Sequence, residues 1–157
     1  PQHPLFAHLG AEPLGDDLSA DYLARRARGR KVPLKSFLMD QRHVAGLGNI
    51  YVCEALFRAR ISPERQARFL ADRRAHPTPR AEALVAAIVT VIETAIRAGG
   101  STLRDYRHAD GSRGAFQESF AVYGRDGLPC VQSGCEGTIK RTVHAGRATF
   151  YCPVCQR

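Results

Sequence analysis

Residues 129–157 read PCVQSGCEGTIKRTVHAGRATFYCPVCQR and hold four of the five cysteines of the chain. The four are Cys130, Cys135, Cys152 and Cys155, and their spacing is C-x4-C-x16-C-x2-C. Two short loops of this kind bring four thiolates to one point, as tetrahedral zinc requires, and four protein ligands leave no position open for catalysis. A redox dithiol or a disulfide is the alternative. We therefore predict one structural zinc ion, which replaces the core that so short a segment cannot build.

The residues between the two cysteine pairs are predicted to form a β-hairpin. Residues 138–145 and 147–152 are rich in β-branched and aromatic side chains, and His144, Ala145 and Gly146 would make the turn. The segment is also basic, with no acidic residue after Glu136. A solvated basic face is the simple interpretation, but in a protein of this charge a phosphate-facing surface is the better one.

The whole chain is basic as well, with a formal net charge of +8 over 157 residues. This length predicts one domain, or one domain with a small satellite. An apolar fraction of 44% is ordinary for a folded protein. We find no run of eighteen apolar residues and no signal peptide pattern, so we expect a soluble cytosolic protein with no membrane partner. The charge favours a polyanionic partner, with nucleic acid ahead of a membrane, although basicity can also serve solubility alone.

The segment before the hairpin is predicted to be mostly helical. Apolar residues recur at helical spacing in four stretches, namely 18–30, 33–40, 50–61 and 81–98. Ser19 or Asp17 can cap the first helix. In the last helix one apolar stripe is expected from Leu84, Ile88, Ile92 and Ile96.

Two places in the sequence indicate function rather than architecture. The first is the Gly-x-Gly-Asn turn at 46–49, which opens directly into a helix and would offer unpaired backbone N–H groups and the Asn49 amide to a phosphate. The alternative is that Asn49 only caps the helix. Glu54 and Arg58, farther along the same helix, are interpreted as an i,i+4 surface pair. The second place is the glycine-rich stretch 107–124, since a loop of this length in a compact protein is either functional or disordered.

Three segments resemble the bacterial formamidopyrimidine-DNA glycosylases. They are LKSFLMDQRHVAGLGNIYVCEALF (34–57), GGSTLRDYRHADGSRGAFQESFAVYGRDGLPC (99–130) and GRATFYCPVCQR (146–157). Enzymes of this family remove oxidised purines, such as 8-oxoguanine and formamidopyrimidines, and then nick the abasic site. The endonuclease VIII branch shares the architecture, but the long loop with DGSRGAF is more similar to the former group.

The resemblance implies the C-terminal part of that family, a mainly α-helical domain with a helix–two-turn–helix followed by a small four-cysteine zinc finger. The implied parts are an interdomain segment (1–13), the helical DNA-binding domain (14–106), a lesion-capping loop (107–119) and the zinc-finger hairpin (120–157).

The resemblance also implies roles for individual residues. Gly48 and Asn49 of the GNIY motif would contact the DNA backbone near the lesion, and Lys31 and Lys35 match other DNA-contacting positions. Arg147 would reach the phosphates that flank the lesion and is linked to the δ-elimination step. The damaged nucleotide must leave the duplex because its glycosidic carbon is inaccessible there. The loop residues expected to cover it are Arg107, Gly111, Ser112, Arg113, Gly114 and Phe116.

The sequence departs from the family pattern in two ways. The first knuckle is C-x4-C instead of C-x2-C, which widens one loop and leaves the zinc prediction in place. The family's chemistry belongs to an N-terminal β-rich domain that begins with a proline nucleophile followed by a glutamate, with a lysine farther along. Here Gln2 follows Pro1, and residues 1–14 resemble the interdomain segment, so we expect none of these catalytic groups in this sequence.

We therefore expect the DNA-binding half of a glycosylase and abasic-site lyase. It would bind double-stranded DNA with an oxidised base or abasic site without excising the base. It would act as a monomer in the bacterial cytoplasm at the nucleoid, with the catalytic domain of the same parent chain as its partner. A free-standing DNA- or RNA-binding zinc-ribbon module, and a ribbon that only docks protein partners, are the alternatives.

Overall fold

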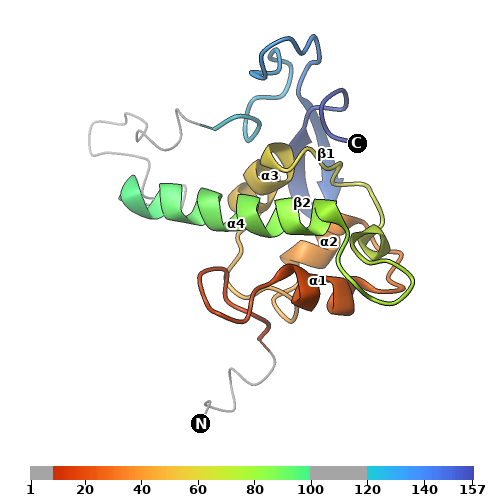
Figure 1. Ribbon diagram of the computed structural model, residues 1–157. Helices are drawn as coiled ribbons and strands as arrows, with labels where there is room; N and C mark the ends of the chain where they lie inside the picture. Colours follow the sequence, from red (N-terminus) through yellow and green to blue (C-terminus); the bar gives the residue numbers. More distant parts are fainter. Residues whose placement is uncertain (1–8, 100–119) are drawn as a thin grey trace.

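A helical part precedes a two-stranded hairpin in the computed structural model, which describes residues 9–99 and 120–157 (Figure 1). The elements are α1 (Ala20–Ala27), α2 (Leu34–Met39), α3 (Asn49–Arg58), the 3₁₀ helix η2 (Ala67–Leu70), α4 (Pro79–Arg97), β1 (Lys140–His144) and β2 (Arg147–Tyr151). This order confirms the predicted fold class. The predicted lesion-capping loop, 107–119, lies outside the described residues, and the domain boundaries remain predictions.

The ends of α1 follow from its flanking residues. Ser19 caps the helix, because its hydroxyl oxygen accepts a hydrogen bond of 3.0 Å from the backbone N–H of Tyr22. The helix stops at Ala27, before the predicted end at residue 30, because Arg28 leaves the helical conformation with a ψ of 127°. Of the two capping residues expected from the sequence, the structure confirms Ser19.

The buried face of α4 differs from the predicted stripe. Leu84 and Ile88 are fully buried, but Ile92 is only partly buried and the side chain of Ile96 is 61% exposed. With about 3.6 residues per turn, each i to i+4 step advances about 40° around the helix, so the three steps from Leu84 to Ile96 turn the stripe away from the core. The face that remains in the core is made by Ala81, Leu84, Ala87, Ile88, Val91 and Ala95.

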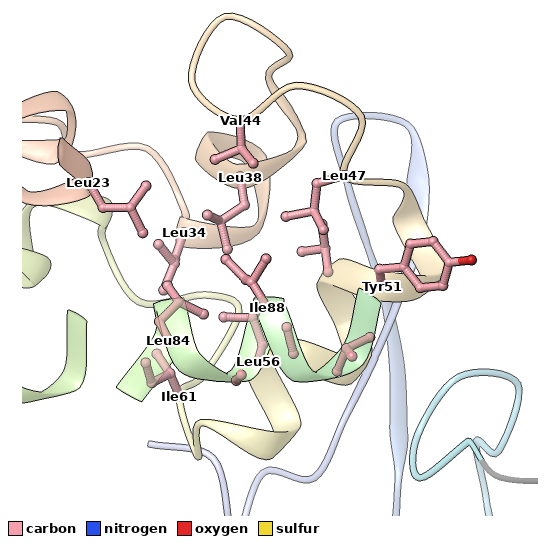
Figure 2. Packing of buried hydrophobic residues seen from close by; sticks show 14 of the residues in the cluster. Leu23, Leu34, Leu38, Val44, Leu47, Tyr51, Leu56, Ile61, Leu84 and Ile88 are labelled. Atoms are coloured by element: carbon pink, nitrogen blue, oxygen red, sulfur yellow. The ribbon is translucent and has the colours of Figure 1, made fainter. Parts of the chain in front are cut away.

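The main core lies between the helices. Leu23 of α1, Leu34 and Leu38 of α2, and Leu56 of α3 pack around the buried face of α4 (Figure 2). Every residue of α3 from Asn49 to Phe57 is buried, because this helix contacts α2, α4 and β2. Within residues 9–99 and 120–157, none of the helices combines the length and the apolar composition that a membrane span requires.

The hairpin is antiparallel, and its register pairs His144 with Arg147 and Thr142 with Thr149. Ala145 and Gly146 connect the strands with φ values of 51° and 75°. Two central residues with positive φ define the type I′ turn, whose twist matches that of the strands. The predicted hairpin and the position of its turn are thus confirmed.

A second, smaller core joins the hairpin to the helical part. Cys53 and Phe57 of α3 pack there with Val122, Ile139 and Phe150. The fifth cysteine is therefore a buried apolar contact of α3 and not a member of the zinc cluster. The hairpin and the helices share this core, so neither part is packed independently of the other.

Candidate metal centre and nucleic-acid interface

The four clustered cysteines converge as predicted. Their Sγ atoms all lie within 4.8 Å of one another, with 3.6 Å from Cys130 to Cys155 and 3.7 Å from Cys135 to Cys152. Zn–S bonds of about 2.3 Å in a tetrahedron place sulfur atoms about 3.8 Å apart, so this geometry fits zinc. The distances exceed that of a disulfide bond, which is about 2.05 Å. The four thiolates form a closed structural zinc site.

Backbone N–H groups orient the thiolates. The N–H of Gln132 donates to Cys130 Sγ at 3.5 Å, that of Gly137 to Cys135 Sγ at 3.4 Å, and that of Cys155 to Cys152 Sγ at 3.4 Å. Hydrogen bonds to metal ligands fix their positions and stabilise their negative charge. The longer C-x4-C loop therefore still presents both of its sulfur atoms to the metal.

Asn49 links the start of α3 to the hairpin. Its Nδ2 donates to the carbonyl oxygen of Ala148 at 2.9 Å, next to Arg147 in β2. Gly48 is the N-cap residue and Asn49 is the first helical residue, so the alternative that Asn49 only caps the helix is wrong. Its Oδ1 is buried and accepts no hydrogen bond from the described residues. Because Gly48 has no side chain to cap α3, the helix start can offer its first N–H groups to an outside acceptor.

Lys35 lies beneath the hairpin with none of its surface exposed. Its Nζ donates to Thr149 Oγ1 at 2.8 Å, and Thr149 Oγ1 lies 2.9 Å from His144 Nδ1. Burial lowers the pKa of Lys35, and the nearby Arg147 lowers it further, while Cys53 opposes this. A direct phosphate contact by Lys35 would require the side chain to leave this position.

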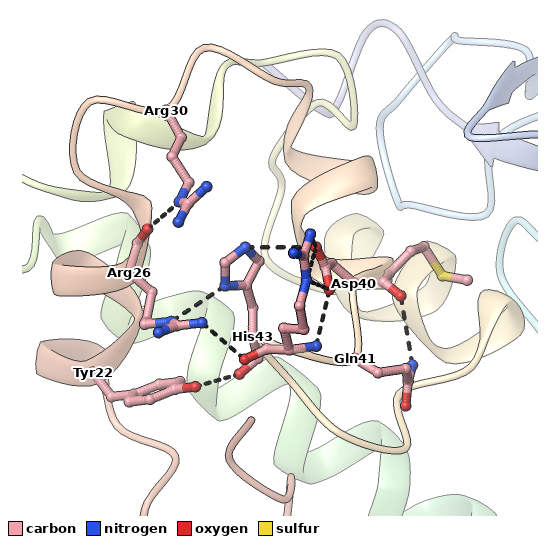
Figure 3. A network of polar contacts seen from close by, with 8 residues as sticks. Tyr22, Arg26, Arg30, Asp40, Gln41 and His43 are labelled. Carbon is pink, nitrogen blue, oxygen red and sulfur yellow. Dashed lines mark hydrogen bonds and ion pairs between the residues drawn. The ribbon is translucent and has the colours of Figure 1, made fainter. Parts of the chain in front are cut away.

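A polar network holds the loop that leads to α3 (Figure 3). Tyr22 donates from its hydroxyl to the carbonyl oxygen of His43 at 2.6 Å, and Arg26 donates to His43 Nδ1 at 3.2 Å. The His43 ring stacks on Phe37, with 4.3 Å between ring centroids. The nearby carboxylate of Asp40 bonds Arg42, which lowers the Asp40 pKa to about 2. Residues from α1 and α2 thus position the turn that presents Gly48 and Asn49.

Glu54 has a role that the sequence did not reveal. The predicted surface pair with Arg58 is wrong, because the Glu54 carboxylate is buried and accepts three backbone N–H groups. The distances are 2.7 Å from Ala121, 2.9 Å from Val122 and 3.0 Å from Tyr123. Burial raises the pKa of Glu54, and the three donors oppose this rise. The carboxylate ties α3 to the start of the zinc-finger part.

The structure brings several predicted site residues together. Gly48, Asn49 and Lys35 of the helical part all lie at the hairpin strand that begins with Arg147, whose side chain is exposed. Lys31 is exposed in the segment between α1 and α2, and no hydrogen bond among the described residues connects its side chain to this junction. The loop residues expected to cover a base, from Arg107 to Phe116, lie outside the described residues.

Sequence reasoning missed three residues of the junction, namely Glu54, Thr149 and Gln156. The buried Gln156 accepts from the Cys152 N–H at 2.8 Å and donates to the Ile61 carbonyl at 2.9 Å. For Glu54 one signal was available, since NIYVCEALF is apolar on all sides of the helix. A helix of that kind is buried, and a lone carboxylate in it needs partners.

Two family models match the chain. A model of the formamidopyrimidine-DNA glycosylase H2TH domain matches residues 9–107, and one of the zinc finger found in FPG and IleRS matches residues 127–157. The formamidopyrimidine-DNA glycosylase of Chelativorans sp. (strain BNC1) is 61% identical over 155 residues, which cover 99% of this chain and 52% of that protein. The formamidopyrimidine-DNA glycosylase of Cereibacter sphaeroides (strain ATCC 17029 / ATH 2.4.9) is 58% identical over 155 residues, which cover 99% of this chain and 53% of that protein.

Solved structures agree with these matches. The crystal structure of the MutM (Fpg) protein from Thermus thermophilus superposes with a TM-score of 0.79 at 46% identity, covering 98% of this chain and 55% of that one. The complex between Lactococcus lactis Fpg and DNA with an abasic site gives a TM-score of 0.80 at 35% identity, covering 98% of this chain and 53% of the Fpg chain. This chain spans about half the length of the relatives it matches. With its matched helical domain, its zinc finger and a site geometry that agrees with both, the chain belongs to the formamidopyrimidine-DNA glycosylase family.

Proposed function

We propose that this chain is the DNA-binding half of a base-excision-repair DNA glycosylase and abasic-site lyase that acts on oxidised purines. The relatives carry the name of that enzyme. Similar solved structures are Fpg bound to DNA with an abasic site and MutM bound to DNA with carbocyclic 8-oxo-G. The net charge of +8 supports a phosphate-rich partner. The chain would act as a monomer in the cytoplasm, at the nucleoid, with the catalytic part of the same parent chain as its partner.

The observation that carries this proposal is the junction between α3 and the hairpin. It joins Asn49 to Ala148 across 99 positions of sequence and places the start of a helix beside the exposed Arg147. A helix N-terminus and an arginine side chain both bind phosphate oxygens. We assign backbone contacts near the lesion to Gly48, Asn49 and Arg147, with Arg147 also serving the δ-elimination step. Lys31 adds a contact at its exposed position, and Lys35 contributes positive charge from beneath the hairpin.

The base-covering role belongs to the loop after α4. In this proposal the residues from Arg107 to Phe116 close over the nucleotide that has left the duplex, because a reacting base must be held outside the stack.

Binding is tested by fluorescence anisotropy with the 157-residue chain and an abasic-site duplex, titrated with salt. We expect Arg147→Ala to weaken binding about 5- to 100-fold and to reduce the slope of log K against log salt by about 1. Arg73→Ala, which removes the same charge from an exposed loop, is the control and should bind like the wild type. Equal affinity for a structured RNA and for the abasic duplex would instead favour the RNA-binding alternative.

Excision is tested under single-turnover conditions on a duplex with 8-oxoguanine. We expect no release of the base, because no residue of this sequence matches the nucleophile of the family by the resemblance described above. Base release by the pure chain would show that it carries its own catalytic groups and would overturn this part of the proposal.

A further inference from the structure

His144 lies beside Arg147 at the end of the hairpin. The two residues are directly paired in the register, immediately before and after the Ala145-Gly146 turn. Side chains of directly opposite residues project from the same face of an antiparallel pair, with Cβ atoms about 5 Å apart. That face also carries Thr149, which contacts Lys35 of the helical part. Whatever Arg147 binds at the hairpin end therefore comes within reach of His144.

The contacts behind His144 favour one protonation state of its ring. As an ammonium group Lys35 can only donate, so Thr149 Oγ1 is the acceptor of their 2.8 Å hydrogen bond. The single hydroxyl proton of Thr149 is then free to donate to His144 Nδ1, 2.9 Å away. A ring nitrogen that accepts a hydrogen bond carries no proton, and a neutral imidazole then has its proton on Nε2. Three side chains from two parts of the fold thus leave an N–H donor on His144.

A doubly protonated imidazole does not suit this position. An N–H on Nδ1 would take the second lone pair of the Thr149 oxygen, and the hydroxyl proton of the fully buried Thr149 would then have no acceptor in this group of three side chains. Burial and Lys35 lower the pKa of His144, and Glu64 opposes this. These contacts favour the neutral ring, which is half-buried and still reaches the surface.

We propose that His144 is a further DNA-backbone contact, which donates its Nε2–H to a phosphodiester oxygen beside Arg147, and that Lys35 and Thr149 are the positioning residues that hold it in this form. This inference rests on the proposed function, since it assumes DNA at the hairpin end. It assigns to the interface a neutral donor, which differs in kind from the arginine next to it. A charged contact releases counterions, so its loss lowers both the affinity and the salt slope, whereas the loss of a neutral donor lowers the affinity alone.

The experiment measures affinity for an abasic-site duplex as a function of salt for the 157-residue chain and five variants. We expect His144→Leu to bind about three- to tenfold more weakly with an unchanged salt slope, because one hydrogen bond of ordinary strength is lost. His144→Gln should retain most of the affinity, since its amide can still donate. Thr149→Val should behave like His144→Leu, and Thr149→Ser, which keeps the hydroxyl, should rescue binding. Arg147→Ala, the fifth variant, should lower both the affinity and the salt slope. Each variant is first checked for one bound zinc ion.

Long-range ¹H–¹⁵N NMR spectra of the imidazole provide a second measurement. If Thr149 served only the packing of the fold, its substitution would leave the tautomer of His144 unchanged. The wild type should show a bare Nδ1 and a protonated Nε2, and Thr149→Val should show a mixture of tautomers. Normal binding by His144→Leu together with weak binding by Arg147→Ala would overturn the inference and leave the proposed function standing. A salt slope reduced by about 1 in His144→Leu would show that the ring binds as a cation and would also overturn it. Normal binding by Arg147→Ala would remove the proposed function itself.

Discussion

Individual buried polar side chains connect the helical part of this protein to the zinc-finger part. Glu54, Lys35 and Asn49 all belong to the helical part, and each makes its hydrogen bonds with residues of the zinc-finger part. A buried polar group that loses its partner retains the full cost of its desolvation. Single substitutions at these positions are therefore expected to have large effects.

Glu54→Gln tests the most heavily bonded of these groups. A glutamine presents an NH₂ group where the carboxylate accepted backbone N–H donors, so at least one of the three hydrogen bonds is lost. We expect the free energy of unfolding to fall by about 1–3 kcal/mol, measured by urea denaturation. Glu93→Gln, which makes the same change on the exposed side of α4, is the control. A similar small effect for both variants would contradict the role assigned to Glu54.

His43 should make stability depend on pH. Burial and Arg26 lower the pKa of His43, so the unfolded chain, with a pKa of about 6.5, takes up the proton first as the pH falls. Stability is therefore retained above about pH 6.5 and declines below it, toward the lower pKa of the folded state.

The measurement is the free energy of unfolding at about pH 7.5 and about pH 5.5, on either side of the unfolded pKa. His43→Gln should show a smaller decline than the wild type, with a remainder from groups such as His144, whose pKa is also lowered. Arg25→Gln, which removes a charge from α1 and leaves the ring in place, is the control. An equal decline in His43→Gln and the wild type would exclude His43 as the source.

At the level of elements, α3 is the central piece. Its first residue bonds to the hairpin, its middle carries Cys53 and Glu54, and its Phe57 enters the second core. The zinc knuckles in turn set the ends of the hairpin, because Cys130 precedes β1 and Cys152 follows β2 directly. The hairpin end with Arg147 is thus positioned from both sides.

Gly137→Ala tests the packing inside the first knuckle. A Cβ at this position would lie 2.6 Å from Cys152 Sγ and 3.0 Å from Val154 Cβ, so a metal ligand would have to move. Overpacking of this kind costs about 1–3 kcal/mol, which corresponds to about 5- to 100-fold weaker zinc binding in competition with a coloured chelator. Gly15→Ala, where the nearest atoms lie at 3.4 Å, should leave zinc affinity unchanged. Equal zinc affinity for Gly137→Ala and the wild type would contradict the close packing.

At the scale of the whole molecule, the helices and the zinc finger behave as one body. They share the second core, and the C-terminal turn docks on the helical part, where Arg80 and the N–H of Ser62 both donate to the carbonyl of Arg157. The zinc site should therefore support the helices as well as the hairpin.

Removal of zinc tests this coupling. Metal binding contributes directly to folding free energy, so chelation should lower the melting temperature of the helical far-ultraviolet dichroism signal, by about 4–8 °C for a loss of about 2 kcal/mol. Zinc added back should restore the transition, and magnesium should not. A helical signal that melts at the same temperature with and without the chelator would show that the two parts fold independently.

Features that depend on residues close together in the chain could be predicted from the sequence. The two cysteine pairs, the strands between them, the turn at Ala145 and Gly146, and the cap at Ser19 all follow from local spacing and composition, and the structure confirms them. The helices were also predicted in place, because their apolar period is local. Three details differ from the prediction: α1 ends early at Ala27, the 3₁₀ helix η2 was not predicted, and the turn of α4 carries Ile96 out of the core.

Contacts between polar residues far apart in the chain depend on how the elements pack and could not be predicted. Lys35 reaches Thr149 across 114 positions and Glu54 reaches Ala121 across 67. Neither partner could be chosen from the sequence, because many residues could offer the same donor or acceptor and no local spacing selects one of them. A charged residue seen in isolation is most simply assigned to the surface, as Glu54 was, since ionised groups avoid burial. Only packing against a second element supplies the donors and acceptors that make such burial stable, and here it is also what assembles the junction beside Arg147.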